Sequence, residues 1–180
     1  RLAAGRATAR DLVALARSLR LIPEVRSLLS NREEQVLLGL LERLDGLNDI
    51  HDKVSASLVD DPPLKITEGG LIQDGFDEPL DNLRRSAEAG RAFIAELEQH
   101  ERERTGIPTL KVGFNGVFGY YFEVTKPYYQ QVPDDYRALQ TLKDRQRYAR
   151  ADLREKEREI TRAEEAARTR EYEVFCELRE

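Results

Sequence analysis

Two apolar seams, each with a seven-residue repeat, flank a segment rich in glycine and aromatic residues. The first seam consists of Leu80, Leu83, Ala87, Gly90, Ile94 and Leu97, and the second of Leu153, Ile160, Ala167 and Val174. Narrow seams on otherwise charged helices are typical of helices that pair with one another. We therefore expect two long antiparallel helices with a small antiparallel β-sheet inserted at their far end. Charged residues three apart, Glu155 with Arg158 and Glu159 with Arg162, would support the exposed helix face.

The chain is expected to divide into four segments, two of which are these helices. Residues 1–75 predict a multihelical core segment, in which Thr8 and Asp11 resemble a capping box and Pro23 suits the first turn of a second helix. Residues 62–75 break the helical pattern with paired prolines and glycines, and predict a hairpin or a pair of extended segments. The first long helix is expected at 76–105, the β-rich module at 106–150 and the returning helix at 151–180. The predicted fold class is mainly α, and α+β overall.

The charge of the chain is unevenly distributed. The 180 residues carry a net charge of −5. Residues 106–150 contain seven basic and four acidic residues, a net charge of +3, which leaves −8 for the rest. A basic module attracts backbone phosphates. Lys and Arg also guard exposed sheet edges, so both explanations stay open on the residues alone.

Residues 109–127, TLKVGFNGVFGYYFEVTKP, combine three glycines with alternating apolar residues. A phosphate-binding loop is disfavoured, because no Lys–Ser/Thr pair follows the last glycine and the next residues alternate like a strand. The pattern favours a β-hairpin. A loop of three or five residues around Asn115 places both apolar sets on one face, whereas a two-residue turn would separate them. We expect the rings in the core of the module, with Tyr121 as the candidate for stacking on a base.

A second pair of strands is expected between Tyr136 and Tyr148, with Lys143-Asp144 as its turn. If the four strands follow one another as a meander, the Asn115 turn and the Lys143 turn lie at the same end of the sheet. That arrangement would place four polar side chains at the outermost tip of the module: Asn115, Lys143, Arg145 and Arg147.

Several long stretches of the chain resemble one known family. They are GRATARDLVALARSLRLIPEVRSLL, VDDPPLKITEGGLIQDGFDEPLDNLRR, GIPTLKVGFNGVFGYYFEVTKP, VPDDYRALQTLKDRQRY and the ending EYEVFCELRE. In this order they closely resemble the MutS DNA mismatch-repair proteins over essentially the whole chain. The resemblance implies that this region is the lever, or core, domain with the clamp domain inserted into it. In that family the clamp contacts the DNA backbone without reading its sequence.

The resemblance also assigns DNA contacts within the clamp. The family motif QTLKN…ERY is matched by QTLKDRQRY. The contacts carry over to Lys143 and Arg147, and to Asn115 in the other turn. Asp144 stands where the family commonly has asparagine, and its negative charge repels phosphate. The neighbouring Arg145 can offset that charge.

Full-length relatives act as dimers that scan double-stranded DNA, bind mismatches, use ATP and Mg²⁺, and recruit a MutL partner. Their mismatch wedge, Phe-x-Glu, belongs to an N-terminal domain, and we expect no such motif in this chain. The sequence contains no G-x-x-x-x-G-K-[ST] nucleotide loop. The resemblance therefore implies a non-enzymatic fragment without a cofactor. It would grip the DNA backbone and transmit the position of the clamp to distant ATPase domains.

The remaining features bear on location and on an alternative function. The single Cys176 excludes an internal disulfide, and His51 and His100 have no partner at metal-ligand spacing. No apolar run is long enough to cross a membrane and no secretory signal opens the chain, so we expect a cytoplasmic, nucleoid-associated bacterial protein. The lack of methionine indicates a fragment of a longer protein. The alternative is a structural helical stalk whose β tip contacts another protein or a second copy of the chain.

Overall fold

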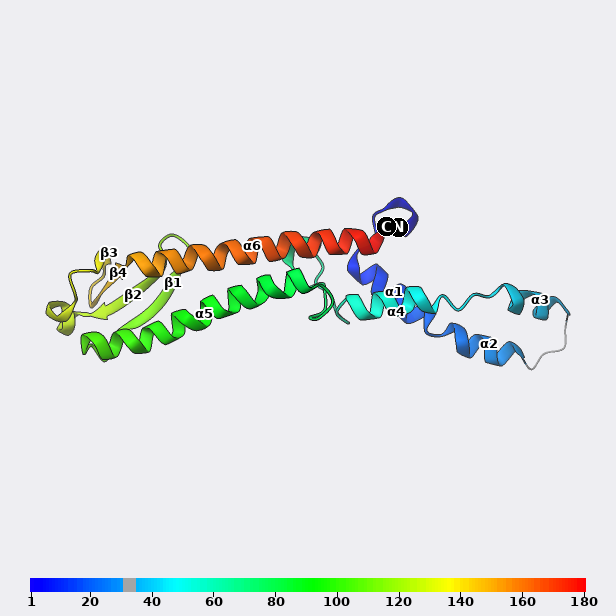
Figure 1. Cartoon of the computed structure of the whole chain (residues 1–180), viewed down its shortest axis with the longest axis horizontal. Helices are drawn as coiled ribbons and strands as arrows, with labels where there is room; N and C mark the ends of the chain where they lie inside the picture. Colours follow the sequence, from blue (N-terminus) through cyan, green and yellow to red (C-terminus); the bar gives the residue numbers. More distant parts are fainter. Residues whose placement is uncertain (31–34) are drawn as a thin grey trace. The chain divides into compact units, whose positions relative to one another are not determined.

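The computed structural model describes residues 1–30 and 35–180. These residues form two compact units, one made of 1–81 with 167–180 and the other of 82–166. Helices dominate the chain, and the second unit contains a four-stranded antiparallel sheet (Figure 1). The predicted fold class, mainly α and α+β overall, is confirmed.

Four short helices lie among the described residues of the first unit. Their bounds are α1 (Ala9–Leu19), α2 (Ile22–Ser30), α3 (Gln35–Arg43) and α4 (Asn48–Ser57), after a 3₁₀ turn η1 (Leu2–Ala4). The predicted capping box is confirmed, because Thr8 Oγ1 accepts from the Asp11 N–H at 3.2 Å and the Asp11 carboxylate accepts from the Thr8 N–H at 2.9 Å. It satisfies two backbone donors that the first turn of a helix leaves unpaired.

The core of this unit is smaller than the multihelical core predicted for it. α1 packs on α4, and Leu12 and Val54 are buried. α2 and α3 pack on each other instead. No residue of α2 is buried, and Leu28 of α2 and Val36 of α3 are exposed. The apolar stripes of these two helices therefore find only part of their expected cover within the described residues.

Residues 62–75 are not a hairpin. Ile66–Glu68 form a 3₁₀ turn, η2, in place of the predicted extended segment. Ile72 does lie in an extended segment, but it bridges Leu58. The reason is Glu171 of the last helix, whose carboxylate accepts hydrogen bonds of 2.6 to 2.9 Å from the backbone N–H groups of Ile72 and the two residues before it. This carboxylate uses the donors that a hairpin partner would have needed.

The two long helices are α5 (Glu78–Thr105) and α6 (Ala151–Arg179), against predicted ranges of 76–105 and 151–180. Within the second unit they run antiparallel (Figure 1). The predicted seams are buried there at Ala87, Ile94, Leu97, Leu153 and Ile160. At Gly90 the Ile160 side chain of α6 occupies the space that a Cβ atom would fill. A larger residue at this position of the seam would therefore require Ile160 to move.

The sheet has the strand order β1-β2-β4-β3, so the predicted meander is wrong. Its elements are β1 (Lys111–Asn115), β2 (Gly119–Thr125), the 3₁₀ turn η3 (Lys126–Gln131), β3 (Arg137–Thr141) and β4 (Arg145–Ala149). β4 pairs with β2, with Phe122 opposite Tyr148 and Thr125 opposite Arg145. β3 lies at the edge. Its residues are half-buried or exposed, which suits an edge strand, whereas β4 ends in two buried residues and takes the inner place.

The β1–β2 hairpin has a three-residue loop, as burial of one face predicts. Asn115 pairs with Gly119, and three residues lie between them. Gly119 has a φ of 72°, the left-handed conformation that commonly closes a loop of this length. Val112 lies opposite Phe122, so the apolar residues of both strands share a face.

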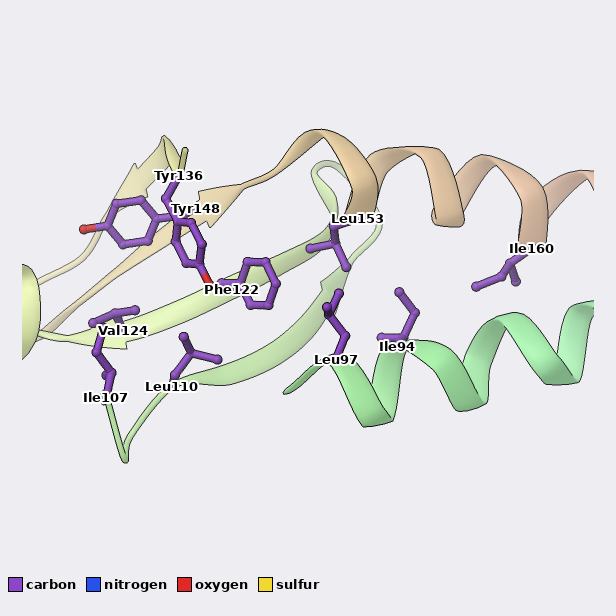
Figure 2. Packing of buried hydrophobic residues seen from close by; sticks show 10 residues of the cluster. All are labelled: Ile94, Leu97, Ile107, Leu110, Phe122, Val124, Tyr136, Tyr148, Leu153 and Ile160. Carbon is purple, nitrogen blue, oxygen red and sulfur yellow. The ribbon is translucent and has the colours of Figure 1, made fainter. Parts of the chain in front are cut away.

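The apolar face of the sheet packs against the ends of the two long helices. Figure 2 shows Leu97 of α5 and Leu153 of α6 beside Phe122 of β2. The Phe122 ring stacks on Tyr136, with 4.8 Å between the ring centroids. The buried cluster comprises Ile94, Leu97, Ile107, Leu110, Phe122, Val124, Tyr136, Tyr148, Leu153 and Ile160. The prediction that the rings mostly build the core is confirmed, with Phe114 as an exposed exception.

Candidate nucleic-acid interface

The other face of the sheet is polar. Because side chains alternate along a strand, the register places Lys111, Glu123 and Arg147 side by side on it. Tyr121 lies two residues before Glu123 in β2, and Arg145 lies two residues before Arg147 in β4, so both share this face. We call the surface made of these five residues the polar sheet face. Its three basic residues and one acidic residue give it a net positive charge, which attracts anions.

Glu123 holds both arginines of the polar sheet face. Arg145 Nη1 donates to Glu123 Oε1 at 2.9 Å, and Arg147 Nε donates to Glu123 Oε2 at 3.3 Å. The hydrogen bond to Glu123 raises the pKa of the Arg145 guanidinium. Arg147 Nη1 also donates to Gln140 Oε1 at 2.9 Å. The Arg145 side chain remains half exposed, whereas that of Arg147 is mostly covered. Arg145 is therefore the more accessible of the two.

Tyr121 is covered on both sides, so it does not fit the prediction of a ring open to a base. The guanidinium carbon of Arg147 lies 4.5 Å from the ring centroid, within cation–π range. Gly113 lies opposite Tyr121 in β1, where a Cβ atom would come within 2.7 Å of the ring. The glycine makes room for the ring, and the arginine covers it.

The β3–β4 connection is a two-residue turn at Lys143-Asp144, as predicted. The Leu142 N–H donates to the carbonyl of Arg145 at 2.8 Å, and the Lys126 N–H donates to the carbonyl of Asp144 at 3.0 Å. The Lys143 side chain is exposed and forms no ion pair within residues 1–30 and 35–180. It is therefore ready to bind an anion, with the exposed Asp144 beside it.

Asn115 does not lie beside this turn. β2 begins opposite Asn115 and ends opposite Arg145, so the two turns lie at opposite ends of the sheet. β2 spans seven residues, about 20 Å. The predicted common tip is wrong because it assumed a meander. Asn115 Oδ1 instead accepts from the Val117 N–H at 2.8 Å, an Asx turn that stabilises its own loop.

A buried ion network that was not predicted from the sequence joins the sheet to both long helices. Glu101 of α5 is 1% exposed. Its carboxylate accepts from Arg104 Nη2 at 2.8 Å and from the Tyr136 hydroxyl at 2.7 Å, and pairs with Arg150 Nη1 at 2.8 Å. Arg150 lies between β4 and α6. A signal was present in the sequence, because the 3-4 spacing of the first seam, continued from Leu97, predicts a buried residue at 101.

The electrostatics of Glu101 follow from these partners. Burial alone would raise its pKa, but hydrogen bonds from Arg104, Arg150 and Tyr136 outweigh burial and lower the pKa from 4.5 to about 2. Burial, followed by the hydrogen bond to Glu101, raises the pKa of the Tyr136 phenol. The carboxylate is ionised at neutral pH and ties α5 to the start of α6 and to the segment before β3.

The expectation that no Phe-x-Glu motif occurs is wrong, because its letters occur at Phe76-Asp77-Glu78 and at Phe175-Cys176-Glu177. The second triplet lies within α6, where Phe175 is buried. The first lies at the start of α5, where Asp77 Oδ1 accepts from the Leu80 N–H at 2.9 Å. Arg170 Nη2 donates to Asp77 Oδ2 at 2.7 Å, and this bond lowers the pKa of Asp77. These contacts account for the first triplet as a helix start.

Two further observations bear on the class of protein. Among the described residues, no three His, Cys, Asp or Glu side chains are grouped so that they could hold a metal ion. No helix in that part of the chain is both long and apolar enough to cross a bilayer. The cytoplasmic location stays a prediction, as do the DNA contacts of Lys143, Arg145, Arg147, Asn115 and Asp144.

Known proteins match the chain over its whole length. The model of MutS family domain IV matches residues 75–166, which include the sheet and the Glu101 network. The chain is 55% identical, over all 180 residues, to the DNA mismatch repair protein MutS of Thermus aquaticus, and 53% identical to that of Thermus thermophilus. It is 49% identical over 178 residues, 98% of its length, to MutS of Natronomonas pharaonis. It covers 21% of each of these relatives and so spans about a fifth of their length. Because the family model covers half of the chain and these identities extend from end to end, the chain belongs to the MutS family.

Proposed function

We propose that the inserted sheet grips the backbone of double-stranded DNA and that the two long helices transmit its position to other parts of a MutS protein. The observation that carries the proposal is Lys143, an exposed cation with no ion pair in the described residues, next to a polar sheet face of net positive charge. The relatives are DNA mismatch repair proteins, which supports DNA as the partner.

The grip is expected to be indifferent to sequence. Base edges are read by a helix or ribbon that enters a groove, whereas Lys and Arg side chains on turns make contacts to phosphates that carry no sequence information. Lys143 and Arg145 are of this second kind. Two or three phosphate contacts fall short of the six to ten that make binding tight and strongly salt-dependent. Binding by this chain alone should therefore be weak.

The Glu101 network supports the mechanical part of the proposal. It links the end of α5, the start of α6 and Tyr136 through a buried charge, so a displacement of the sheet moves the helix ends with it. In a whole protein, we propose that ATP and Mg²⁺ bind in other domains, that two copies form a dimer, and that a MutL-type partner is recruited. The present chain is proposed to be non-enzymatic and to need no cofactor.

The test is a titration of the chain against fluorescent duplexes of different sequence, at salt concentrations between about 50 and 200 mM. The affinity should fall with salt and should not depend on sequence. Lys143→Ala combined with Arg147→Ala should reduce the slope of log K against log salt by at least about 0.9, the value expected for the removal of one phosphate contact. Arg26→Ala with Lys53→Ala, which removes two exposed charges from the first unit, is the matched control. Binding that ignores salt, or a slope that both double variants change equally, would rule out the grip.

A second candidate is a structural stalk whose sheet contacts protein. It is favoured by two apolar side chains at the β1–β2 hairpin, Phe114 at 63% and Val117 at 84% exposure. Crosslinking and small-angle scattering would detect self-association through this hairpin. A dimer that is lost in Phe114→Ser with Val117→Ser, together with undetectable duplex binding, would favour the stalk over the clamp.

A further inference from the structure

We propose a second phosphate-binding surface, on α6 and the edge strand β3, that takes the backbone of the same DNA beyond the turn at Lys143. We call it the arginine track and define it by Arg137, Arg154, Arg158 and Arg162. The inference rests on the proposed function for the identity of the polyanion. Nothing in the family resemblance assigns DNA contacts to these residues.

Two adjoining hollows define the track. One, of about 450 Å³, lies between β3, the end of β4 and the start of α6, and Arg137 and Arg154 line it. The other, of about 550 Å³, runs along α6, and Arg154, Arg158 and Arg162 line it. Arg154 lines both, so the two hollows adjoin at this residue. The four guanidinium groups of the track are thus distributed over two neighbouring hollows.

The spacing on α6 suits a regular polyanion. Arg154, Arg158 and Arg162 are four residues apart and therefore share one side of the helix, about 6 Å apart along its axis. Phosphates of one DNA strand follow each other about every 3.4 Å along the duplex axis, so each step on the helix is comparable with about two phosphate steps. An acidic helix with carboxylates four residues apart has the same repeat of about 6 Å. The choice of a nucleic-acid backbone therefore rests on the proposed function of the sheet, and the spacing fits that choice.

Two guanidinium groups of the track, those of Arg158 and Arg162, have no carboxylate partner in the described residues. The predicted i,i+3 pair between Glu159 and Arg162 does not form, because Glu159 pairs with Lys156. Nor does Glu155 pair with Arg158, whose Nε donates only to a backbone carbonyl. Within the described residues, Arg158 and Arg162 form no ion pair.

The other two arginines are also accessible. Arg137 is exposed and has no ion pair in the described part of the chain. Arg154 has one carboxylate partner, Glu157 at 3.4 Å. Glu157 and Asp135 are the two acidic residues that line the hollows. Asp135 already pairs with Arg104 at 3.3 Å. The track keeps a net positive charge after these pairs are counted.

The track continues the polar sheet face. Arg137 lies opposite Ala149 in β4, two residues along from Arg147 on the same face of the sheet. The next arginine of the track is Arg154, in the first turn of α6, which lines the same hollow as Arg137. A DNA backbone that contacts Lys143 can thus meet further cations along β4 and α6 rather than leave the protein at the sheet. The number of phosphate contacts rises above the two or three of the turn alone.

The experiment compares salt dependence in three double variants of the same chain. They are Arg158→Ala with Arg162→Ala for the track, Lys143→Ala with Arg147→Ala for the turn, and Arg26→Ala with Lys53→Ala as the control. Removal of each phosphate contact lowers the slope of log K against log salt by about 0.9, so the track variant should lower it by about 1.8. Between about 50 and 200 mM salt, the wild type should then lose about twelvefold more affinity than the track variant. Arg158→Glu with Arg162→Glu should reduce affinity further, and circular dichroism checks that α6 stays folded.

The outcomes separate this inference from the proposed function. If the track variant behaves like the control while the turn variant lowers the slope, the track is overturned and the clamp stands. If the track variant lowers the slope and the turn variant does not, the track is supported and the grip at Lys143 is overturned. If duplex binding is unaffected but polyglutamate binds the wild type and not the track variant, the surface is for acidic protein and the phosphate assignment fails.

Discussion

The buried carboxylate of Glu101 should control the stability of the unit that carries the sheet. Its replacement by glutamine keeps the size of the side chain but removes the charge. Arg104 would keep Asp135 as a partner at 3.3 Å, whereas the Arg150 side chain, 13% exposed, would lose its partner on α5 and keep Asp152 at 2.6 Å. Breaking a buried pair from one side is costly because the other charge remains buried. The variant tests whether this network fixes the sheet on the helices.

The magnitude follows from the pKa of Glu101. A carboxyl whose pKa falls from 4.5 to about 2 on folding contributes about 3 kcal/mol to the free energy of unfolding at pH 7. Because the folded pKa lies below the unfolded one, this contribution is complete above about pH 4.5 and is lost as the pH falls toward 2. Near pH 3 about half of it remains. Glu101→Gln should therefore be less stable than the wild type by about 3 kcal/mol at pH 7, and by about half of that at pH 3.

The assay is urea unfolding followed by tyrosine fluorescence. Six of the seven tyrosines lie in residues 82–166, so the signal reports mainly on the unit that contains the network. Glu96→Gln, at an exposed position of the same helix, is the control and should change stability little. A difference between the wild type and Glu101→Gln below about 1 kcal/mol at pH 7, or one that does not change with pH, would show that the network does not hold the carboxylate ionised as its contacts imply.

Three further substitutions test the packing. Gly90→Ala should lower the melting temperature, because its Cβ would overlap Ile160 and overpacking typically costs about 1–3 kcal/mol, more than the gain in helix propensity; an unchanged melting temperature would mean that the Ile160 side chain can move aside without loss. Gly119→Ala should also destabilise, and a second change of Glu157→Ala should restore only part of the loss, since the clash goes but the left-handed φ remains. If urea unfolding showed that Glu157→Ala restores the full stability, the left-handed φ at position 119 would carry no cost, contrary to this expectation. Thr8→Ala should cost about 1 kcal/mol through loss of the α1 cap, measured by thermal unfolding, and no loss would show that the cap is redundant.

Local patterns predicted much of the fold because local physics decides those elements. The seams of the two long helices follow from helical periodicity. The three-residue loop after Asn115 follows from the need to bury the apolar residues of β1 and β2 on one face. The buried charge at Glu101 could have been expected from the same seam. Its partners could not, because Arg150 and Tyr136 reach it from distant parts of the chain.

The order of the strands was not predictable by the same reasoning. A meander and the observed strand order both fit the alternation of apolar and polar residues along each strand. The choice between them depends on which strand can be buried between two others. β3 carries Arg137 at its start and is exposed along much of its length, whereas Tyr148 of β4 is buried opposite Phe122. Burial therefore places β4 inside and β3 at the edge. This exchange separates Asn115 from the turn at Lys143, which no pairwise spacing in the sequence reveals.

The observed pairing also ranks the candidate DNA contacts. Arg147 is held by Glu123, Gln140 and the Tyr121 ring, so it would have to give up these partners to bind a phosphate, whereas Lys143 has none to give up within the described residues. Lys143→Ala alone should therefore lower the salt slope of duplex binding by about 0.9 with little change in stability. Arg147→Ala should change the slope less and lower the melting temperature more, because it uncovers the Tyr121 ring. If Arg147→Ala instead lowers the slope as much as Lys143→Ala and leaves the melting temperature unchanged, Arg147 binds phosphate directly and its contacts on the sheet are incidental.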